Sequence, residues 1–356
     1  MSRPMQAKGP HQGDDVTLRF KAASAAVALA LSLAACSAQA ESGSQASPAP
    51  SASASAAVSE PALRPEGTIL FLRTTGNDQH AYYTANADGT AERQLTRVGE
   101  YCCNNRISPD WSQMIVMPGG APPTPVTGGL LTIDATGFTP LHVNDPTLNL
   151  VPEAWSPDGT RIAFEGWDDS DPTRTGLYTG TSGDVTDVVR LTSTSGTPHD
   201  VALDYSPDGS MLVFYRAVRG EPDFPIDIGG SLWVVNIDGS DVRQLDTPPP
   251  NWWARWSPDG TTILFVSERN QPTGAISTIR SDGSGLTKLF EDSDGGFPID
   301  PIWSPDGSQI MFMLDPISDR FTHPNNVLYV MRSDGTGLTK LIDTPDFKSS
   351  PEWWSP

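Results

Sequence analysis

The chain has 356 residues, and its 43 aspartate and glutamate residues outnumber its 23 lysine and arginine residues, which gives a net charge of −20. So acidic a surface repels nucleic acid and anionic lipid headgroups, so we expect neither as a binding partner. An apolar content of 37% is enough to form a core, and 33 prolines with 32 glycines fit a fold of many short strands and tight turns.

The N-terminal segment has the pattern of an export signal. Arg19 and Lys21 precede the apolar run Ala22–Leu33, which is too short to stay in a bilayer as a permanent helix. The run ends in Leu33-Ala34-Ala35-Cys36, which resembles the lipobox of bacterial lipoproteins. The resemblance implies that residues 1–35 are a lipoprotein signal peptide and that the thiol of Cys36 is acylated. The alternative is an ordinary secretory signal with an incidental cysteine.

Residues 36–64 are dominated by serine, alanine and proline. Such a segment cannot bury apolar surface, so we expect a disordered tether. Loss of residues 1–35, with four basic and two acidic residues, would leave a net charge near −22. The predicted location is the bacterial cell membrane, with the body facing the periplasm or the cell exterior.

One motif recurs through residues 65–356. The tripeptide Ser-Pro-Asp, followed by glycine in four of five copies, begins at Ser108, Ser156, Ser206, Ser257 and Ser304, and the chain stops at Ser355-Pro356. The serine-to-serine spacings are 48, 50, 51, 47 and 51 residues. A period near 50 with short alternating strands predicts an array or propeller of four-stranded antiparallel units.

The two ends of this region complete each other. Residues Pro351–Pro356 end a first strand without its continuation, and Pro65–Phe71 are a continuation without a first strand, with Glu66 in place of the aspartate. The sequence therefore predicts an all-β, six-bladed β-propeller whose N- and C-terminal strands share one blade and leave no open sheet edge.

The Ser-Pro-Asp-Gly units, followed by motifs such as Ile263-Leu264-Phe265 and by Asp-Gly and Leu-Thr, resemble the WD40-like repeat of TolB and related periplasmic propellers. The resemblance covers roughly residues 65–356 and implies the propeller fold. TolB has an α/β domain before its propeller, whereas here a tether precedes it, so the partners of TolB are not transferred.

Functional loops of propellers meet the central channel at the face opposite the tight turns. We expect one residue from each blade to line that channel mouth as a ring of mixed charge, namely Arg106, Glu153, Asp204, Arg255, Asp300 and Glu352. The alternative is that these side chains are solvated strand ends.

The chemistry of catalysis or metal binding is sparse in the sequence. No Gly-x-Ser-x-Gly elbow occurs, and we predict no catalytic residue and no cofactor. His80, His199 and His323 fall in different blades without ligand spacing, and the acidic segments Asp168–Asp171 and Glu291–Asp294 do not match an EF-hand, so any metal is left open. Cys102 and Cys103 form a vicinal disulfide or remain reduced.

These features predict a monomeric, non-enzymatic binding or scaffold propeller. Its expected partner is an envelope protein, peptide or glycan, and its contact with the membrane is through the lipid anchor alone. The alternative is a saccharide-acting lyase or hydrolase with a site on the same face, which a close cluster of the three histidines would favour.

Overall fold

The computed structural model describes residues 63, 65–75, 79–102, 106–118, 127–185, 187–194, 198–218, 230–270, 273–316, 326–344 and 346–355. Val58–Pro356 forms one compact unit. Among the described residues no helix is long and apolar enough to cross a membrane, and the one helical element is the short 3₁₀ turn η1, Pro172–Arg174. Cys36 and the expected signal peptide lie outside the described residues.

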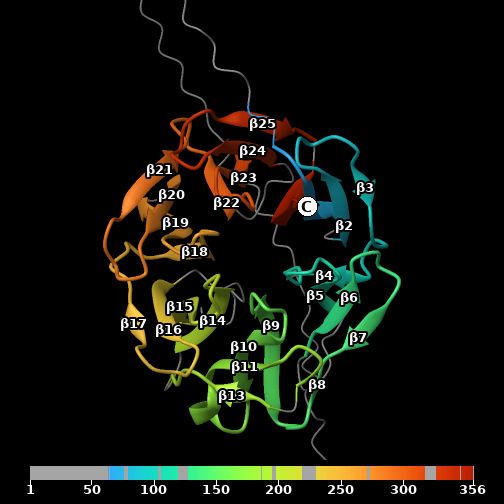
Figure 1. Cartoon of the computed structure of the whole chain (residues 1–356), viewed down its shortest axis with the longest axis vertical. Coiled ribbons are helices and arrows are strands. Elements are labelled where there is room, and N and C mark those ends of the chain that lie inside the picture. Colours follow the sequence, from blue (N-terminus) through green and yellow to red (C-terminus); the bar gives the residue numbers. More distant parts are fainter. Residues whose placement is uncertain are drawn as a thin grey trace, which may run out of the picture. The chain divides into compact units, whose positions relative to one another are not determined.

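Six antiparallel sheets of four strands each stand around a central axis, as the blades of a propeller (Figure 1). We number the blades along the chain and give strands from the channel outward. Blade 1 contains β4 (Tyr101–Cys102), β5 (Gln113–Pro118), β6 (Gly129–Thr132) and β7 (Phe138–Pro140). Blade 2 contains β9 (Leu148–Trp155), β10 (Arg161–Asp168), β11 (Gly176–Thr181) and β13 (Val189–Arg190). Blade 3 contains β14 (Pro198–Tyr205), β15 (Met211–Val218), β16 (Ser231–Asn236) and β17 (Arg243–Gln244).

The remaining blades repeat this order. Blade 4 contains β18 (Asn251–Trp256), β19 (Ile263–Asn270), β20 (Thr273–Ile279) and β21 (Thr287–Glu291). Blade 5 contains β22 (Phe297–Trp303), β23 (Gln309–Asp315), β24 (Val327–Arg332) and β25 (Thr339–Ile342). Blade 6 contains β26 (Phe347–Trp354), β1 (Thr68–Thr75), β2 (Gln79–Asn86) and β3 (Arg93–Gln94). A short parallel pair, β8 (His142–Val143) with β12 (Asp184–Val185), links blades 1 and 2.

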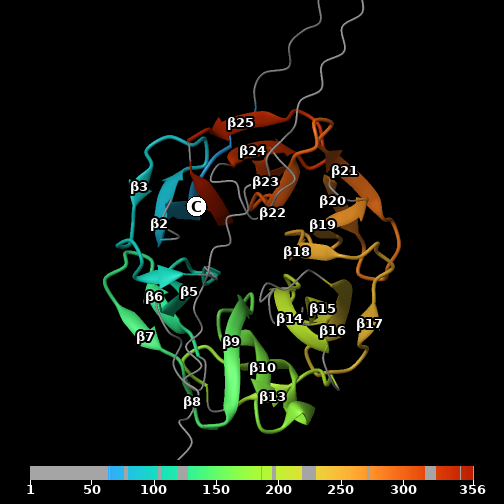
Figure 2. The same ribbon diagram turned by 180° about the vertical axis from the view of Figure 1, so that it is seen from behind.

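Blade 6 confirms the predicted closure. Strand β26 pairs antiparallel with β1, with Trp354 opposite Thr68 and Trp353 opposite Ile69. The indole Nε1 of Trp353 donates to the Glu66 carbonyl at 2.7 Å. Figure 2, from the opposite side, shows β26 in red against the blue strands from the start of the propeller. The closed ring therefore hides a sheet edge at each end of the repeat array.

Each Ser-Pro-Asp-Gly turn is held by its own side chains. In blade 2 the Ser156 hydroxyl donates to Asp158 Oδ1 at 2.6 Å, and the same Oδ1 accepts from the Thr160 amide at 3.0 Å. Gly159 has φ of +71°, a conformation in which a side chain is strained. The repeated motif is thus a structural turn that joins the innermost strand to the next strand of each blade.

Candidate functional site

The innermost strands carry β-bulges at the positions that face the channel. In β18 the register with β19 shifts between Trp252 and Arg255, and Trp253 has φ of +49°. In β22 the shift falls between Ile299 and Ile302, around Asp300 with φ of +48°. Strands β9, β14 and β26 shift at the corresponding place. Because a bulge changes the direction of nearby side chains, it sets the charged residues of these strands apart from the regular pleat.

An ion-pair network crosses the channel. Arg255 of blade 4 donates to Glu352 Oε1 of blade 6 at 2.7 Å, and Arg106, beside blade 1, approaches the same oxygen at 3.5 Å. Arg106 also donates to the Leu203 carbonyl of blade 3 at 2.5 Å. The contacts of Arg255 with Glu352 and of Arg106 with Leu203 join blades that are not neighbours in the ring, so they span the channel, whereas Arg106 and Glu352 belong to adjacent blades. The three side chains retain 14–19% exposure, so the network is shielded but still reached by solvent.

Two further predicted residues connect neighbouring blades. Asp204 of blade 3 accepts from the Trp256 amide of blade 4 at 2.9 Å, and Asp300 of blade 5 accepts from the Ser350 amide of blade 6 at 2.8 Å. Both acceptors are half-buried carboxylates. They satisfy backbone donors of the next innermost strand, near its bulge, and so they fix the wall of the channel.

Burial is the main influence on the pKa values of the carboxyl groups of Asp204, Asp300 and Glu352. It raises the pKa of Asp204 to about 7 and that of Asp300 to about 6, although the charge of Arg106 and the backbone donors act in the opposite direction. Burial likewise raises the pKa of Glu352 to about 7, against the attraction of Arg106. A desolvated carboxylate loses hydration that its partners only partly replace, so the channel changes charge near neutral pH.

The position of the predicted ring along the channel was wrong. The predicted position was the mouth opposite the tight turns, where the innermost strands begin. Glu352 is the sixth residue of eight in β26, and Asp204 and Arg255 each precede the last residue of their strands. Glu153 lies third from the end of β9. These side chains therefore belong to the channel wall, toward the end that carries the Ser-Pro-Asp-Gly turns.

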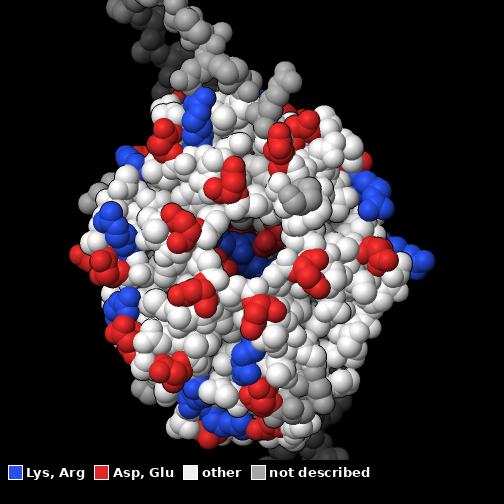
Figure 3. All heavy atoms as spheres, viewed as in Figure 1, with Lys and Arg blue, Asp and Glu red and all other residues white. Residues whose placement is uncertain are grey.

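The turns themselves form an acidic rim, which was not among the candidate sites predicted from the sequence. Successive turns touch: a Cβ on Gly209 would lie 3.4 Å from Pro157, and one on Gly307 would lie 3.6 Å from Pro258. The acidic rim comprises the exposed carboxylates Asp110, Asp158, Asp208, Asp259 and Asp306. Figure 3 shows acidic side chains around the channel opening and both basic and acidic ones inside it. The regular spacing of the aspartate in this motif could have predicted such a rim from the sequence.

Hydrogen bonds keep the acidic rim charged. The pKa of each aspartate is lowered first by the hydroxyl of its turn serine and then by donors two residues further along the chain. Because the donors favour the ionised form, the rim stays negative wherever the protein is folded near neutral pH.

The other sequence candidates do not converge in the described part of the chain. His80 Nδ1 bonds Thr74 Oγ1 at 2.9 Å, and His199 Nδ1 bonds Glu165 Oε1 at 2.7 Å, each within or next to its own blade. No group of three metal-binding side chains occurs among the described residues. Asp168 pairs with Arg174 at 2.8 Å, and Glu291 pairs with Lys288 at 2.6 Å.

Three sequence candidates lie outside what the structure describes. They are Cys36, Cys103 and His323. The backbone of Cys102 belongs to β4. The lipidation site and the vicinal disulfide therefore stay predictions.

Comparison with known proteins places the chain in a family. Residues 127–314 match the model of the TolB beta propeller domain, which is more than half of the sequence, and the chain belongs to that family. An uncharacterised protein of Agrobacterium fabrum is 27% identical over 267 residues, which cover 71% of this chain and 83% of the relative.

Solved structures share the fold at low sequence identity. TolB from Acinetobacter baumannii is 17% identical with a TM-score of 0.59 and covers 81% of this chain, which in turn spans 66% of that TolB. A putative TolB from Agrobacterium tumefaciens is 18% identical with a TM-score of 0.56, over 82% of this chain and all of that structure. An oligogalacturonate lyase in complex with manganese is 16% identical with a TM-score of 0.52, over 77% of this chain and 74% of the lyase. The fold is thus common to TolB proteins and to an enzyme, and function must be argued from the site.

Proposed function

We propose that this chain is an exported, lipid-anchored, non-enzymatic binding protein whose channel recognises a partner at the cell envelope. The observation that carries the proposal is the pair of arginines, Arg106 and Arg255, that meet on one glutamate across the channel. Two cations held in place on a shared carboxylate, with solvent access retained, form a prepared site for an anionic group.

The charges of the channel favour a peptide segment among the three expected partner classes. The acidic rim attracts basic groups at the opening, whereas the arginines inside attract a carboxylate or a backbone carbonyl. A polypeptide chain supplies both signs and is narrow when extended. A neutral glycan offers hydroxyl groups but no charge to match either region, so it fits less of the observed chemistry.

Export and anchoring belong to the same proposal. The apolar run that ends at Cys36 supports a lipid on that residue, at the start of the expected tether, and such an anchor would keep the propeller near the membrane. Metabolic labelling with a fatty-acid analogue is expected to mark the wild-type chain and to leave Cys36→Ser unmarked. Equal labelling of both chains would remove the anchor from the proposal.

The binding function is tested by crosslinking in membranes. The full lipidated chain and its Arg106→Gln/Arg255→Gln variant are compared for the protein crosslinked to each, and Arg280→Gln, an exposed arginine of an outer turn, is the control. The account predicts a partner captured by wild type and by Arg280→Gln but reduced about ten-fold or more by the channel variant. Equal capture by all three would mean that the channel is not the recognition site.

A further inference from the structure

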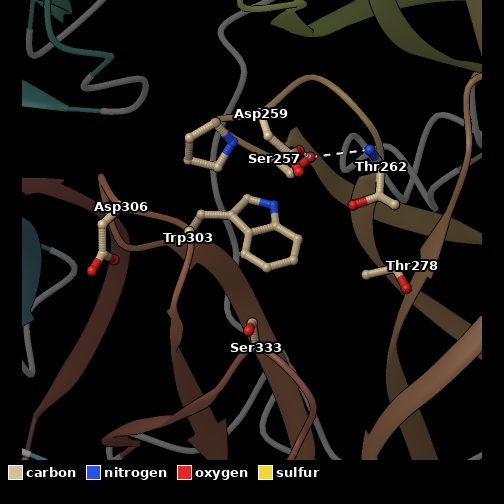
Figure 4. A pocket seen from close by; sticks show the side chains of 9 residues that line it. Ser257, Asp259, Thr262, Thr278, Trp303, Asp306 and Ser333 are labelled. Carbon is tan, nitrogen blue, oxygen red and sulfur yellow. Dashed lines mark hydrogen bonds between the residues drawn. The ribbon is translucent and has the colours of Figure 1, made fainter.

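A cavity of about 330 Å³ lies between blades 4 and 5 and is separate from the channel network. It is lined by Ser257, Pro258, Asp259, Thr262, Thr278, Trp303, Asp306, Gly307 and Ser333. Figure 4 shows the ring of Trp303 in the middle of these side chains, with its nitrogen on the side of Ser257 and Thr262. The exposed Asp259 and Asp306 belong to the acidic rim, so the cavity opens on that face.

The neighbouring blade interfaces show why a cavity forms here. Each interface sets the aromatic residue before the Ser-Pro-Asp-Gly turn against the third strand of the preceding blade. Between blades 2 and 3 the Tyr205 hydroxyl bonds Thr179 Oγ1 at 3.0 Å and closes the gap. Between blades 3 and 4, Trp256 is 6% exposed and packs in one cluster with Val234.

Blade 4 presents a hydroxyl to the aromatic residue of blade 5. Thr278 pairs with Leu264 in the register where Thr179 pairs with Ala163 and Val234 with Val213. Val234 packs with Trp256, and Thr179 bonds the Tyr205 hydroxyl, whereas Thr278 faces an indole with neither kind of contact. Trp303 remains half-buried, and the space between it and Thr278 stays open.

The indole N–H of Trp303 has no polar anchor. Trp155 Nε1 donates to the Arg106 carbonyl at 3.0 Å and is tied to the preceding blade. Trp303 Nε1, like Trp256 Nε1, has no hydrogen-bond partner among the described residues. Whereas Trp256 is 6% exposed, Trp303 is half-buried, so part of its ring faces the cavity.

The lining defines the chemistry of the ligand. Hydrogen bonds lower the pKa of Asp259 and Asp306, so two negative charges stand at the opening. The hydroxyls of Thr278 and Ser333 form no hydrogen bond with another described residue and offer two donors. A tryptophan ring attracts cations through its π face. Two carboxylates, an indole and uncommitted hydroxyls together match a cation that also carries oxygen acceptors.

We propose that this cavity is a binding pocket for a small organic ammonium ion with hydrogen-bond acceptors, supplied by a lysine side chain or by an amino sugar. The ammonium lies against Trp303 between Asp259 and Asp306, and the acceptors of the ligand meet Thr278 and Ser333. The pocket does not depend on what the channel binds, because it shares no residue with the ion-pair network.

The test follows the indole N–H signal of Trp303 by NMR in the full chain carrying Cys36→Ser, with the signal assigned from Trp303→Phe. The probes are Nα-acetyl-lysine methylamide and glucosamine, and their neutral matches are Nα-acetyl-norleucine methylamide and N-acetylglucosamine. At least one cationic probe is expected to shift the Trp303 signal saturably, with a Kd of about 1–10 mM, and the tighter of the two identifies the source. No saturable shift with either cation, or equal shifts with the neutral probes, would overturn the proposal.

Variants locate the binding. Asp259→Asn keeps an oxygen for the turn hydrogen bonds and removes the charge, so it is expected to weaken binding about five-fold. Thr278→Leu fills the cavity and is expected to abolish the shift, with the remaining indole signals unchanged as evidence of an intact fold. Asp158→Asn changes the same turn at the interface that Tyr205 closes and is expected to leave binding unaltered. Equal weakening by Asp158→Asn would show that only the general negative charge matters and would reject the pocket.

Discussion

The aspartates of the acidic rim and those of the channel wall lie a few residues apart in the same repeats, yet their pKa values are shifted in opposite directions. Asp208 is exposed, accepts from Ser206 and Ser210 within its own turn, and has a lowered pKa. Asp204, four residues earlier, is shielded in the wall and accepts from the next blade, and its pKa is raised to about 7. Local donors stabilise the first charge, whereas burial penalises the second.

The turns are a feature that every repeat shares, whereas the charged residues of the channel wall are particular to each blade. The turn positions hold the same residue types around the ring because the hydrogen bonds of each turn are formed within that turn. The wall positions differ from blade to blade, with arginine in two places and carboxylates in four. Arg255 and Glu352 pair across the channel, whereas Asp204 and Asp300 accept from the next blade.

The largest expected effect comes from removing the strand that joins these regions. Deletion of Pro351–Pro356 takes Glu352 out of the channel and Trp353, 9% exposed, out of the blade interface. Loss of a large buried aromatic costs about 3–5 kcal/mol, so the melting temperature of the full chain should fall by about 10 °C or more, with aggregation through the open edge of β1. Deletion of Ser355–Pro356 alone preserves β26 and is the control. A melting temperature within two degrees of wild type for the longer deletion would contradict the shared blade.

Breaking the channel network should have the next largest effect. Arg255→Gln leaves Glu352 with the more distant Arg106, and we expect a loss of about 1–3 kcal/mol in the free energy of unfolding by urea. Glu352→Gln in the same chain should recover part of that loss, because the unpaired carboxylate is removed. Additive losses in the double variant would indicate that the two side chains are not coupled.

The pH dependence of stability distinguishes the two regions directly. The raised pKa values mean that the folded channel binds protons more tightly than the unfolded chain, so its contribution is fully present below pH 4 and is lost as the pH rises through about 6–7. The lowered pKa values of the rim act the other way, and their contribution is lost as the pH falls below the usual range of an aspartate.

We therefore expect the free energy of unfolding to decrease by about 1–2 kcal/mol between pH 5 and pH 8. Asp204→Asn should flatten this dependence, whereas Asp208→Asn should leave it in place. A stability that rises across the same interval would show that the arginines outweigh burial in the channel.

The smallest expected effects lie in the turns. Ser156→Ala and Ser257→Ala each remove a donor to the turn aspartate and an acceptor for the amide five residues on. Each change should reduce the free energy of unfolding by about 0.5–1.5 kcal/mol, and by the same amount within about 0.5 kcal/mol. Unequal losses measured by urea unfolding would show that the turns are not equivalent supports.

Sequence reasoning succeeded where structure is local and periodic. The fixed spacing of the Ser-Pro-Asp-Gly turns predicted the blades, and the incomplete ends at Glu66 and Trp354 predicted the closure. The charged positions of the wall were predicted as the points where the chain enters the innermost strands. Their place along the channel was missed because those strands begin several residues earlier.

Side-chain contacts between blades could not be predicted from the sequence. The pairing of Arg106 and Arg255 with Glu352 depends on bulges whose positive φ values fall on Trp253, Asp300 and Ser350, residues that carry no mark of that conformation. The cavity beside Trp303 was likewise missed, although Thr278 in the position of Val234 was a visible difference once the blades were aligned.

The contrast between rim and wall is tested most directly by titrating individual carboxyl groups by carbon-detected NMR in the intact chain. The account predicts that Asp204 and Glu352 titrate near pH 7 and Asp300 near pH 6, whereas Asp158 and Asp208 titrate below the usual value of an aspartate. Titration of Asp204, Asp300 and Glu352 together with the rim aspartates, at or below pH 4, would contradict it.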